Sequence, residues 1–140
     1  MARNVVPEWA LGKVRLVALD LPEAKEERAW AGVRWVVSKH FAHVVFIERG
    51  WPPAYSKAIS SADGATGGEG PACVLTFRVA KREASAARFT KAPFFKPPWF
   101  SNIVGLVLDE ARTDWDEVGE LVRASFRVLA PKKLVARLGD

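Results

Sequence analysis

The sequence predicts one α+β domain of two layers, in which helices pack on an antiparallel sheet of about five strands. Three observations favour this class. The chain has 140 residues, a common size for a single domain, so residues 1–140 are expected to fold together. Its residue patterns follow the order helix, two strands, loop, strand, short helix, strand and helix. The connections between these segments are short, which favours antiparallel neighbours.

The first half of the chain predicts one helix and two strands. A proline in the first turn and apolar residues at helical spacing predict a helix over residues 7–19. The charged residues 22–29 follow it and predict a loop or a short turn. Residues 33–37 alternate and residues 41–48 are apolar on both faces, which predicts two strands joined near residues 38–40.

The next part adds a loop, two strands and a short helix. Four glycines among small polar residues predict a flexible loop over residues 60–70. Residues 72–79 alternate cleanly and predict a half-buried strand. Alanine and charge over residues 81–89 predict a short helix. Residues 103–108 predict a strand in which Gly105 marks a bulge or a close approach.

The last helix has the strongest signature. Apolar side chains recur with a 3.6-residue period over residues 115–129. Asp114 stands at the position of a helix cap, and Glu117 follows three residues later, as in a capping box. Acidic residues at the start of this segment are therefore expected to serve the helix rather than acid–base catalysis. Pro131 then ends the helix or starts a second short one.

No residue pattern predicts an active site, and we expect neither a metal ion nor a cofactor. His40 and His43 are the two histidines, and residues three apart in a strand point to opposite faces. Cys73 lies on the apolar face of its strand and predicts a buried, inert thiol. Ser125 lies inside the last helix, which excludes a nucleophile elbow. The glycines of residues 60–70 match no nucleotide-binding motif.

The remaining composition points to a cytoplasmic protein without a membrane partner. One cysteine cannot form an internal disulfide. No apolar run approaches the roughly 20 residues that span a bilayer, and the start of the chain shows no signal-like run. The oligomeric state is left open between a monomer and a homodimer.

Positive charge is concentrated in one segment, residues 78–96. Six basic residues and one acidic residue lie there, so the segment carries +5, which equals the net charge of the whole chain. The basic residues are Arg78, Lys81, Arg82, Arg88, Lys91 and Lys96. They alternate with phenylalanines, and cations with exposed aromatic rings suit phosphates and bases. From these residues alone, a solvated face followed by core aromatics is the favoured interpretation.

The C-terminal third resembles the closing signature of the MmcQ/YjbR-like family. Residues 114–118 read Asp-Trp-Asp-Glu-Val, and residues 125–134 read Ser-Phe-Arg-Val-Leu-Ala-Pro-Lys-Lys-Leu. Three earlier segments are similar to motifs of the same family: residues 21–24, 39–42 and 94–99. The resemblance extends from about residue 7 to residue 138. In three departures, Phe126 replaces the usual tyrosine, Ser38 stands where glycine is common, and the loop of residues 49–70 is longer than in many members.

The resemblance implies a compact α+β fold similar to secretion-chaperone-like domains. It also implies DNA binding through a double-wing surface. We therefore expect weak, salt-dependent binding of DNA through a basic surface. The candidate phosphate contacts are Arg78, Lys81, Arg82, Arg88, Lys91, Lys96, Lys39, Lys132 and Lys133.

An alternative hypothesis is a module that binds a protein or a small ligand through exposed aromatic side chains. The chain has six tryptophans, and two of them stand beside prolines, where a chain is often exposed. The candidate residues are Trp51, Tyr55 and Trp99.

Overall fold

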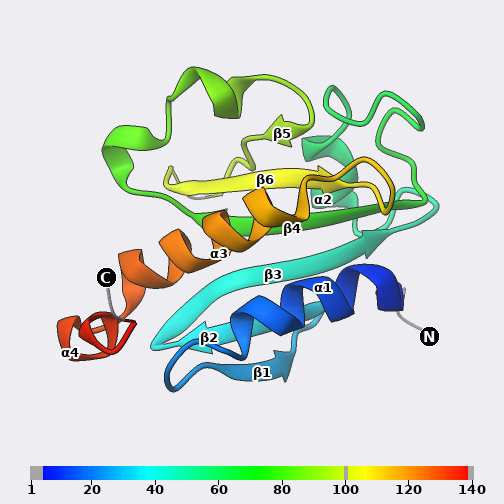
Figure 1. The fold of residues 1–140 in the computed structure, drawn as a ribbon. Helices are drawn as coiled ribbons and strands as arrows, with labels where there is room; N and C mark the ends of the chain where they lie inside the picture. The colour runs from blue at the N-terminus through cyan, green and yellow to red at the C-terminus, as the bar shows by residue number, and fades with distance from the viewer. Residues whose placement is uncertain (1–4, 100, 139–140) are drawn as a thin grey trace.

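The computed structural model describes residues 5–99 and 101–138 and contains a six-stranded antiparallel sheet with helices packed on it (Figure 1). The strand order is β1-β2-β3-β4-β6-β5. The strands are β1 Lys25–Arg28, β2 Val33–Val37, β3 Lys39–Ile47, β4 Ala72–Arg78, β5 Phe94–Phe95 and β6 Ile103–Leu108. The helices are α1 Glu8–Ala18, α2 Pro53–Ala58, α3 Trp115–Leu129 and α4 Lys132–Ala136, with 3-10 turns η1 Lys81–Glu83 and η2 Ala87–Thr90. The predicted α+β class is confirmed, with six strands rather than about five.

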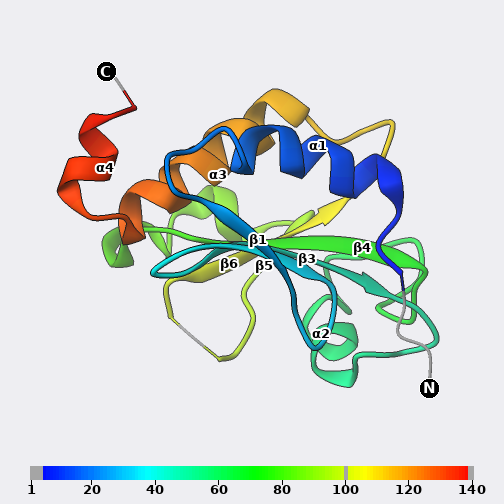
Figure 2. The same cartoon turned by 90° about the horizontal axis from the view of Figure 1, so that it is seen from below.

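Helices α1 and α3 cover one face of the sheet, and the main core lies between them and the strands (Figure 2). Trp35, Phe41, Phe77 and Phe126 are among its fully buried side chains. The rings of Phe41 and Phe126 meet edge to face with centroids 5.5 Å apart. The apolar stripe of α3 is therefore explained by packing on the sheet.

A second, smaller core lies on the opposite face, beneath α2 and the residues that follow it. It contains Val45, Ile47, Val74, Ile59 and Phe95, among others. This cluster buries the second face of β4, so the strand expected to be half-buried is buried along its whole length. Figure 2 shows α2 at one end of this face only, which leaves the other end of the sheet without a helix over it.

Two local predictions were wrong. Residues 22–29 were expected to form a loop or a turn, yet Lys25–Arg28 pairs with β2 as an edge strand. All four of its side chains are exposed, so no apolar alternation marks it in the sequence. The short helix expected over residues 81–89 is two 3-10 turns, because Ala86 between them adopts extended backbone angles.

The glycine-rich loop is built around a buried carboxylate. Asp63 accepts hydrogen bonds from the backbone N–H groups of Ala65, Thr66 and Gly68, and from the Thr66 hydroxyl. Gly68 has φ of +100°, and a Cβ there would lie 2.4 Å from the carbonyl oxygen of Ser56 in α2. The loop therefore packs closely against α2 at Gly68. Its predicted flexibility stays a prediction.

The strand β6 passes directly under an aromatic ring. A Cβ at Gly105 would lie 2.1 Å from Cζ of Phe95, so the close approach predicted at this glycine is confirmed. Phe95 belongs to β5, an edge strand of two residues that lies between Pro93 and Pro97. Within the described residues, no helix is long and apolar enough to cross a membrane.

Candidate nucleic-acid interface

The topology brings basic residues from distant segments to one end of the sheet. The β2–β3 turn, the end of β4, η1, the C-terminal end of α3, and α4 all lie at the left of Figure 1. We call their cations the basic end: Lys39, Arg78, Lys81, Arg82, Arg127, Lys132 and Lys133. All are exposed except Arg78. Within residues 78–96 the structure fits the interpretation favoured from the residues alone, because Lys81, Arg82, Arg88, Lys91 and Lys96 are exposed and Phe89 and Phe95 are core residues.

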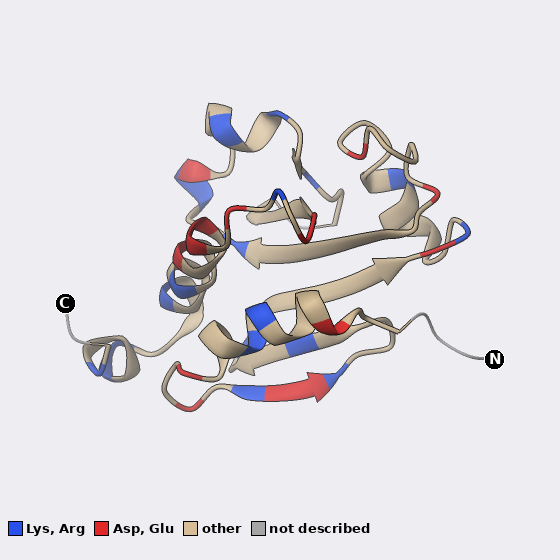
Figure 3. Ribbon diagram, turned by 45° about the vertical axis from the view of Figure 1, so that its right-hand side comes forward, with Lys and Arg blue, Asp and Glu red and all other residues tan. Residues whose placement is uncertain are grey.

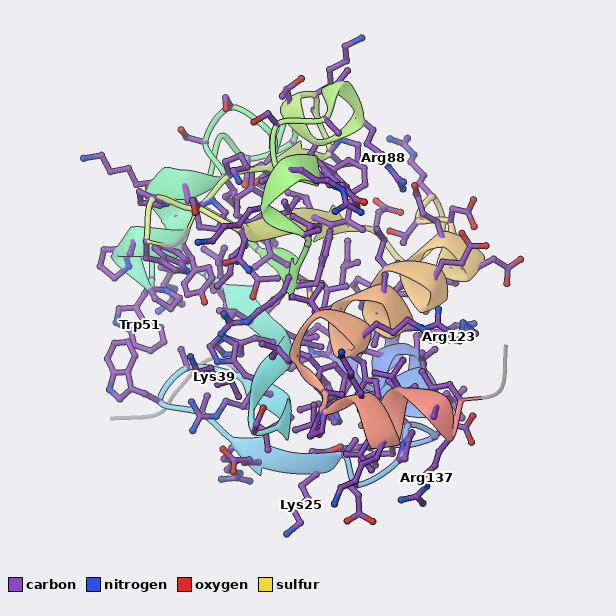
Figure 4. The ribbon with its side chains drawn as sticks, turned by 90° about the vertical axis from the view of Figure 1, so that its left-hand side faces the viewer. Lys25, Lys39, Trp51, Arg88, Arg123 and Arg137 are labelled. Carbon is purple, nitrogen blue, oxygen red and sulfur yellow. The ribbon has the colours of Figure 1, made fainter. Side chains whose placement is uncertain are left out.

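A cleft of about 500 Å³ opens at this end, on the face of the sheet opposite α1 and α3. We call it the basic cleft, and it is lined by Glu27, Arg34, Val36, Ser38, Lys39, His40 and Arg78. Three cations face one carboxylate, and Nε of Arg34 lies 2.8 Å from Oε1 of Glu27. Figure 4 looks onto this end and shows Lys39 on the side of the sheet that carries Trp51, away from Arg123 and α4.

Arg78 lies at the floor of the basic cleft rather than on the surface. Its exposed fraction is 9%, and Nε donates a hydrogen bond of 3.1 Å to the carbonyl oxygen of His40. Burial lowers the pKa of its guanidinium from the usual value. Arg78 was expected among the surface contacts, but it is a fixed, buried cation under them.

The two histidines share one face, so the expectation that they point to opposite faces was wrong. Trp35 pairs with Ala42, and the next residue of β2, Val36, pairs with His40. Strand β3 therefore contains one extra residue, Phe41, and this bulge breaks the alternation of faces. The ring centroids of His40 and His43 are 6.1 Å apart.

Both histidines are neutral at physiological pH. Burial and the nearby charge of Arg78 together lower the pKa of His40 to about 4. Burial also lowers the pKa of His43. Across the described part of the chain, no group of three or more His, Cys, Asp or Glu residues is placed to hold a metal ion.

A serine of α3 completes the sheet at the bulge. Phe41 would stand opposite Arg78 if the β3–β4 register continued, because Ala42 pairs with Phe77. Instead, the Ser125 hydroxyl donates to the Phe41 carbonyl oxygen at 2.5 Å and accepts from the Arg78 N–H at 2.7 Å. Ser125 is fully buried, so it is a structural residue that fixes the floor of the basic cleft. In the sequence, the sign of this structural role is a serine that stands inside the apolar stripe of a helix.

An aromatic row leads from the basic cleft along the same face. It consists of His40, His43, Tyr55 and Trp99, with successive centroids 6.1, 6.1 and 5.0 Å apart. Nε2 of His43 lies 2.6 Å from the carbonyl oxygen of Ala31 and donates to it. Nδ1 is then free of a proton and accepts from the Tyr55 hydroxyl at 3.3 Å. Burial raises the pKa of Tyr55 to about 12.

Two of the three predicted aromatic residues, Tyr55 and Trp99, therefore lie together. The third, Trp51, packs on Trp30 with centroids 5.2 Å apart. Trp30 is 65% exposed and precedes Ala31, whose carbonyl oxygen binds His43. Sequence reasoning missed Trp30, and it missed Arg34, which alternates on β2 with buried Trp35.

The other predicted cations, Arg88, Lys91 and Lys96, lie outside the basic end. Nη2 of Arg88 lies 2.7 Å from the carboxylate of Glu117, and the guanidinium lies over the Phe89 ring. Nζ of Lys96 donates to the carbonyl oxygen of Ser101 at 2.7 Å. Lys91 is exposed after η2. Arg88 lies far from Lys39 in Figure 4.

A groove of about 520 Å³ between η1 and α3 also belongs to the basic end. Arg78, Arg82, Arg88 and Arg127 line it together with Glu83 and Glu120. Four cations against two carboxylates give a net charge of +2, the same as three cations against one carboxylate in the basic cleft.

The opposite end of α3 carries an acidic cleft of about 720 Å³ that sequence reasoning also missed. Its charged lining residues are Asp63, Asp109, Asp114, Glu117 and Arg112. Asp109 and Asp114 accept hydrogen bonds from backbone N–H groups of their own turns. Figure 3 shows the acidic start of α3 and its basic C-terminal part. Charge is therefore separated along the helix.

The buried thiol fits the sequence prediction. Cys73 is 2% exposed in β4, and burial raises its pKa to about 12. A thiol of this kind is protonated at physiological pH and is a poor nucleophile.

Comparison with known proteins shows the fold but not a family. No family model matches the chain, and no curated protein sequence matches it. The crystal structure of a protein from Pseudomonas syringae superposes with a TM-score of 0.54. The match is at 16% sequence identity and covers 76% of this chain and 87% of the other. At this identity the likeness shows a shared fold alone.

Proposed function

We propose that this chain binds nucleic acid through the basic end and has no catalytic activity. The observation that carries the proposal is the convergence of Lys39, Lys81, Arg82, Lys132 and Lys133 from segments that are far apart in the sequence. Two of the segments that resemble the MmcQ/YjbR-like family, residues 39–42 and 125–134, lie at this end. The DNA-binding role and the cytoplasmic location implied above are part of the same proposal.

The physical basis is release of counterions from phosphates. Exposed ammonium and guanidinium groups replace the condensed cations of a nucleic acid, and each neutralised phosphate contributes a salt dependence. Affinity then falls by about 0.9 logarithmic unit per tenfold increase in salt for each phosphate contacted. The described cations form no pattern that reads base edges, so binding is expected to be weak and independent of sequence.

The acidic cleft favours the approach of an anionic ligand from the opposite, basic end of the molecule. Glu117 lines that cleft near the start of α3, and Arg127 lies near the end of the helix. A polyanion is repelled from the first end and attracted to the second, so its long-range approach is directed to the basic end.

The test is fluorescence anisotropy of a labelled oligonucleotide at about 50 and 200 mM salt. The variant Lys81→Glu/Arg82→Glu reverses two charges at the basic end. The control Lys57→Glu/Arg112→Glu makes the same change in net charge on α2 and beside the acidic cleft. We expect the first variant to lose at least about tenfold in affinity at low salt and the control to lose much less.

Two results contradict the proposal. One is the absence of binding by the unmodified chain at low salt. The other is an equal loss in the two double variants, which would reflect net charge rather than a site. Circular dichroism of each variant confirms that the fold is retained.

A further inference from the structure

We propose that the ligand of this surface is single-stranded nucleic acid, with its backbone at the basic cleft and a base stacked on Trp99. The inference rests on the proposed function and names the form of nucleic acid that fits the open face of the sheet. Four features carry it: the size of the basic cleft, the aromatic row beside it, the tryptophans that flank the row, and the rigidity of the floor.

The basic cleft has the size of a small-ligand site. Its volume of about 500 Å³ falls within the range of pockets that enclose a single small molecule. A cleft of this size can take one phosphate and sugar of a strand. Lys81, Lys132 and Lys133 lie at the same end of the sheet without lining the cleft, and they can contact further phosphates of the strand.

A duplex leaves no base face free to stack on the aromatic row. In a double helix the faces of the bases are stacked inside, and the protein meets phosphates and base edges. In a single strand the faces of the bases are available, and aromatic side chains stack on them whatever their sequence. Trp99 is partly exposed at the end of the row, where its ring packs on Tyr55 at 5.0 Å.

The members of the row are uncharged, which suits stacking beside cations. Burial lowers the pKa values of His40 and His43 and raises that of Tyr55, so in each ring burial favours the neutral form. Positive charge lies in the basic cleft at one end of the row, and neutral rings continue from it. This division matches a strand, whose charged backbone and neutral bases are side by side.

A second aromatic platform lies next to the middle of the row. Trp30 is 65% exposed and packs on Trp51 at 5.2 Å. The hydrogen bond from His43 to Ala31 holds the turn that carries Trp30 against the row. A strand that passes over the row can therefore meet Trp30 beside its middle and Trp99 at its end.

The floor of this surface is held by internal bonds rather than by a ligand. The Ser125 hydroxyl bridges Phe41 and Arg78, and Nε of Arg78 bonds to the carbonyl oxygen of His40. Arg78 and His40, the junction between the basic cleft and the aromatic row, are therefore fixed in place. A rigid site loses little conformational entropy on binding.

The experiment compares three probes of one length: a single-stranded DNA, its duplex, and a strand of abasic sites. The variants are Trp99→Ala, Trp30→Ala and, as the matched control, Trp115→Ala, whose ring packs on Trp9 near the acidic cleft. We expect the unmodified chain to prefer the single strand. Trp99→Ala should weaken single-strand binding about fivefold to a hundredfold. Duplex and abasic binding should change little, and the control should behave as the unmodified chain.

The outcomes separate this inference from the proposed function. If duplex binds as tightly as the single strand, or if Trp99→Ala and Trp30→Ala leave single-strand affinity unchanged, the inference is wrong and nucleic-acid binding stands. If no probe binds at low salt, both are wrong. Trp30→Ala keeps the test decisive should Trp99→Ala fail to fold, because Trp30 is largely exposed.

Discussion

The Ser125 hydroxyl takes the place of a backbone bond between β3 and β4. Replacing Ser125 with alanine leaves the Phe41 carbonyl and the Arg78 N–H buried without their partner. We expect Ser125→Ala to lower the free energy of unfolding by about 1–3 kcal/mol. Urea unfolding measures it, with Ser85→Ala at an exposed position as the control. Equal stability of the two variants would show that water or a shifted register replaces the hydroxyl.

His40 makes stability depend on pH. Its pKa is about 4 in the folded chain, below the ordinary value of 6.5. Between these values the unfolded chain binds the extra proton, so the stability from neutral His40 is complete above pH 6.5 and is lost as pH falls toward 4. We expect His40→Gln to show a shallower fall in Tm over this window. An unchanged slope would place the titration on another group.

For single residues, the sequence predicted burial and the face of the sheet correctly where a strand alternates regularly. It failed for residues at the bulge in β3. Cys73 was placed correctly because its strand alternates without interruption. His40 and His43 were assigned to opposite faces because one extra residue in β3 reverses the alternation, and no local pattern marks that residue. Arg78 was expected at the surface because its burial depends on Ser125 and on strands distant in the sequence.

The helix α3 is the element that the sequence described best. Asp114 caps it as predicted, since its side chain accepts from the N–H groups of Asp116 and Glu117 at 3.1 Å each. The Glu117 carboxylate binds Arg88 and so connects the helix to η2.

Loss of the cap should weaken the helix without affecting the basic end. We expect Asp114→Ala to lower the free energy of unfolding by about 1 kcal/mol, because two backbone donors lose their acceptor. The control Asp116→Ala removes a charge near the same helix start without removing the cap, and should cost less. Urea unfolding followed by circular dichroism distinguishes them; a larger loss for Asp116→Ala would contradict the assignment.

Elements without an apolar period were not predictable. β1 consists of four exposed charged residues and is a strand because β2 offers it a partner. α2 has six residues and no fully buried side chain, so it has no apolar stripe. β5 has two residues between prolines. Each depends on tertiary contacts rather than on local preference.

At the scale of the molecule, the candidate site is a product of topology. The sequence identified most of its cations but counted Arg88 and Lys96 with them, and the fold gives both partners within the chain. The sequence analysis did not count Arg127 among the cations, and the fold places it beside η1. No order of residues along the chain shows that Lys39 and Lys132 share one end of a sheet. The nine predicted contacts therefore remain a prediction that the proposed binding experiment tests.

The two edges of the sheet limit how copies of this chain can associate. Growth of a sheet from its edge requires a row of unpaired N–H and C=O groups. On one side β1 presents only charged side chains, Lys25–Arg28, and on the other Phe94–Phe95 is short and flanked by Pro93 and Pro97, which lack an N–H. Strand exchange and amyloid-like stacking are therefore disfavoured at both borders. We therefore expect a homodimer of this chain to join faces or helices rather than sheet edges.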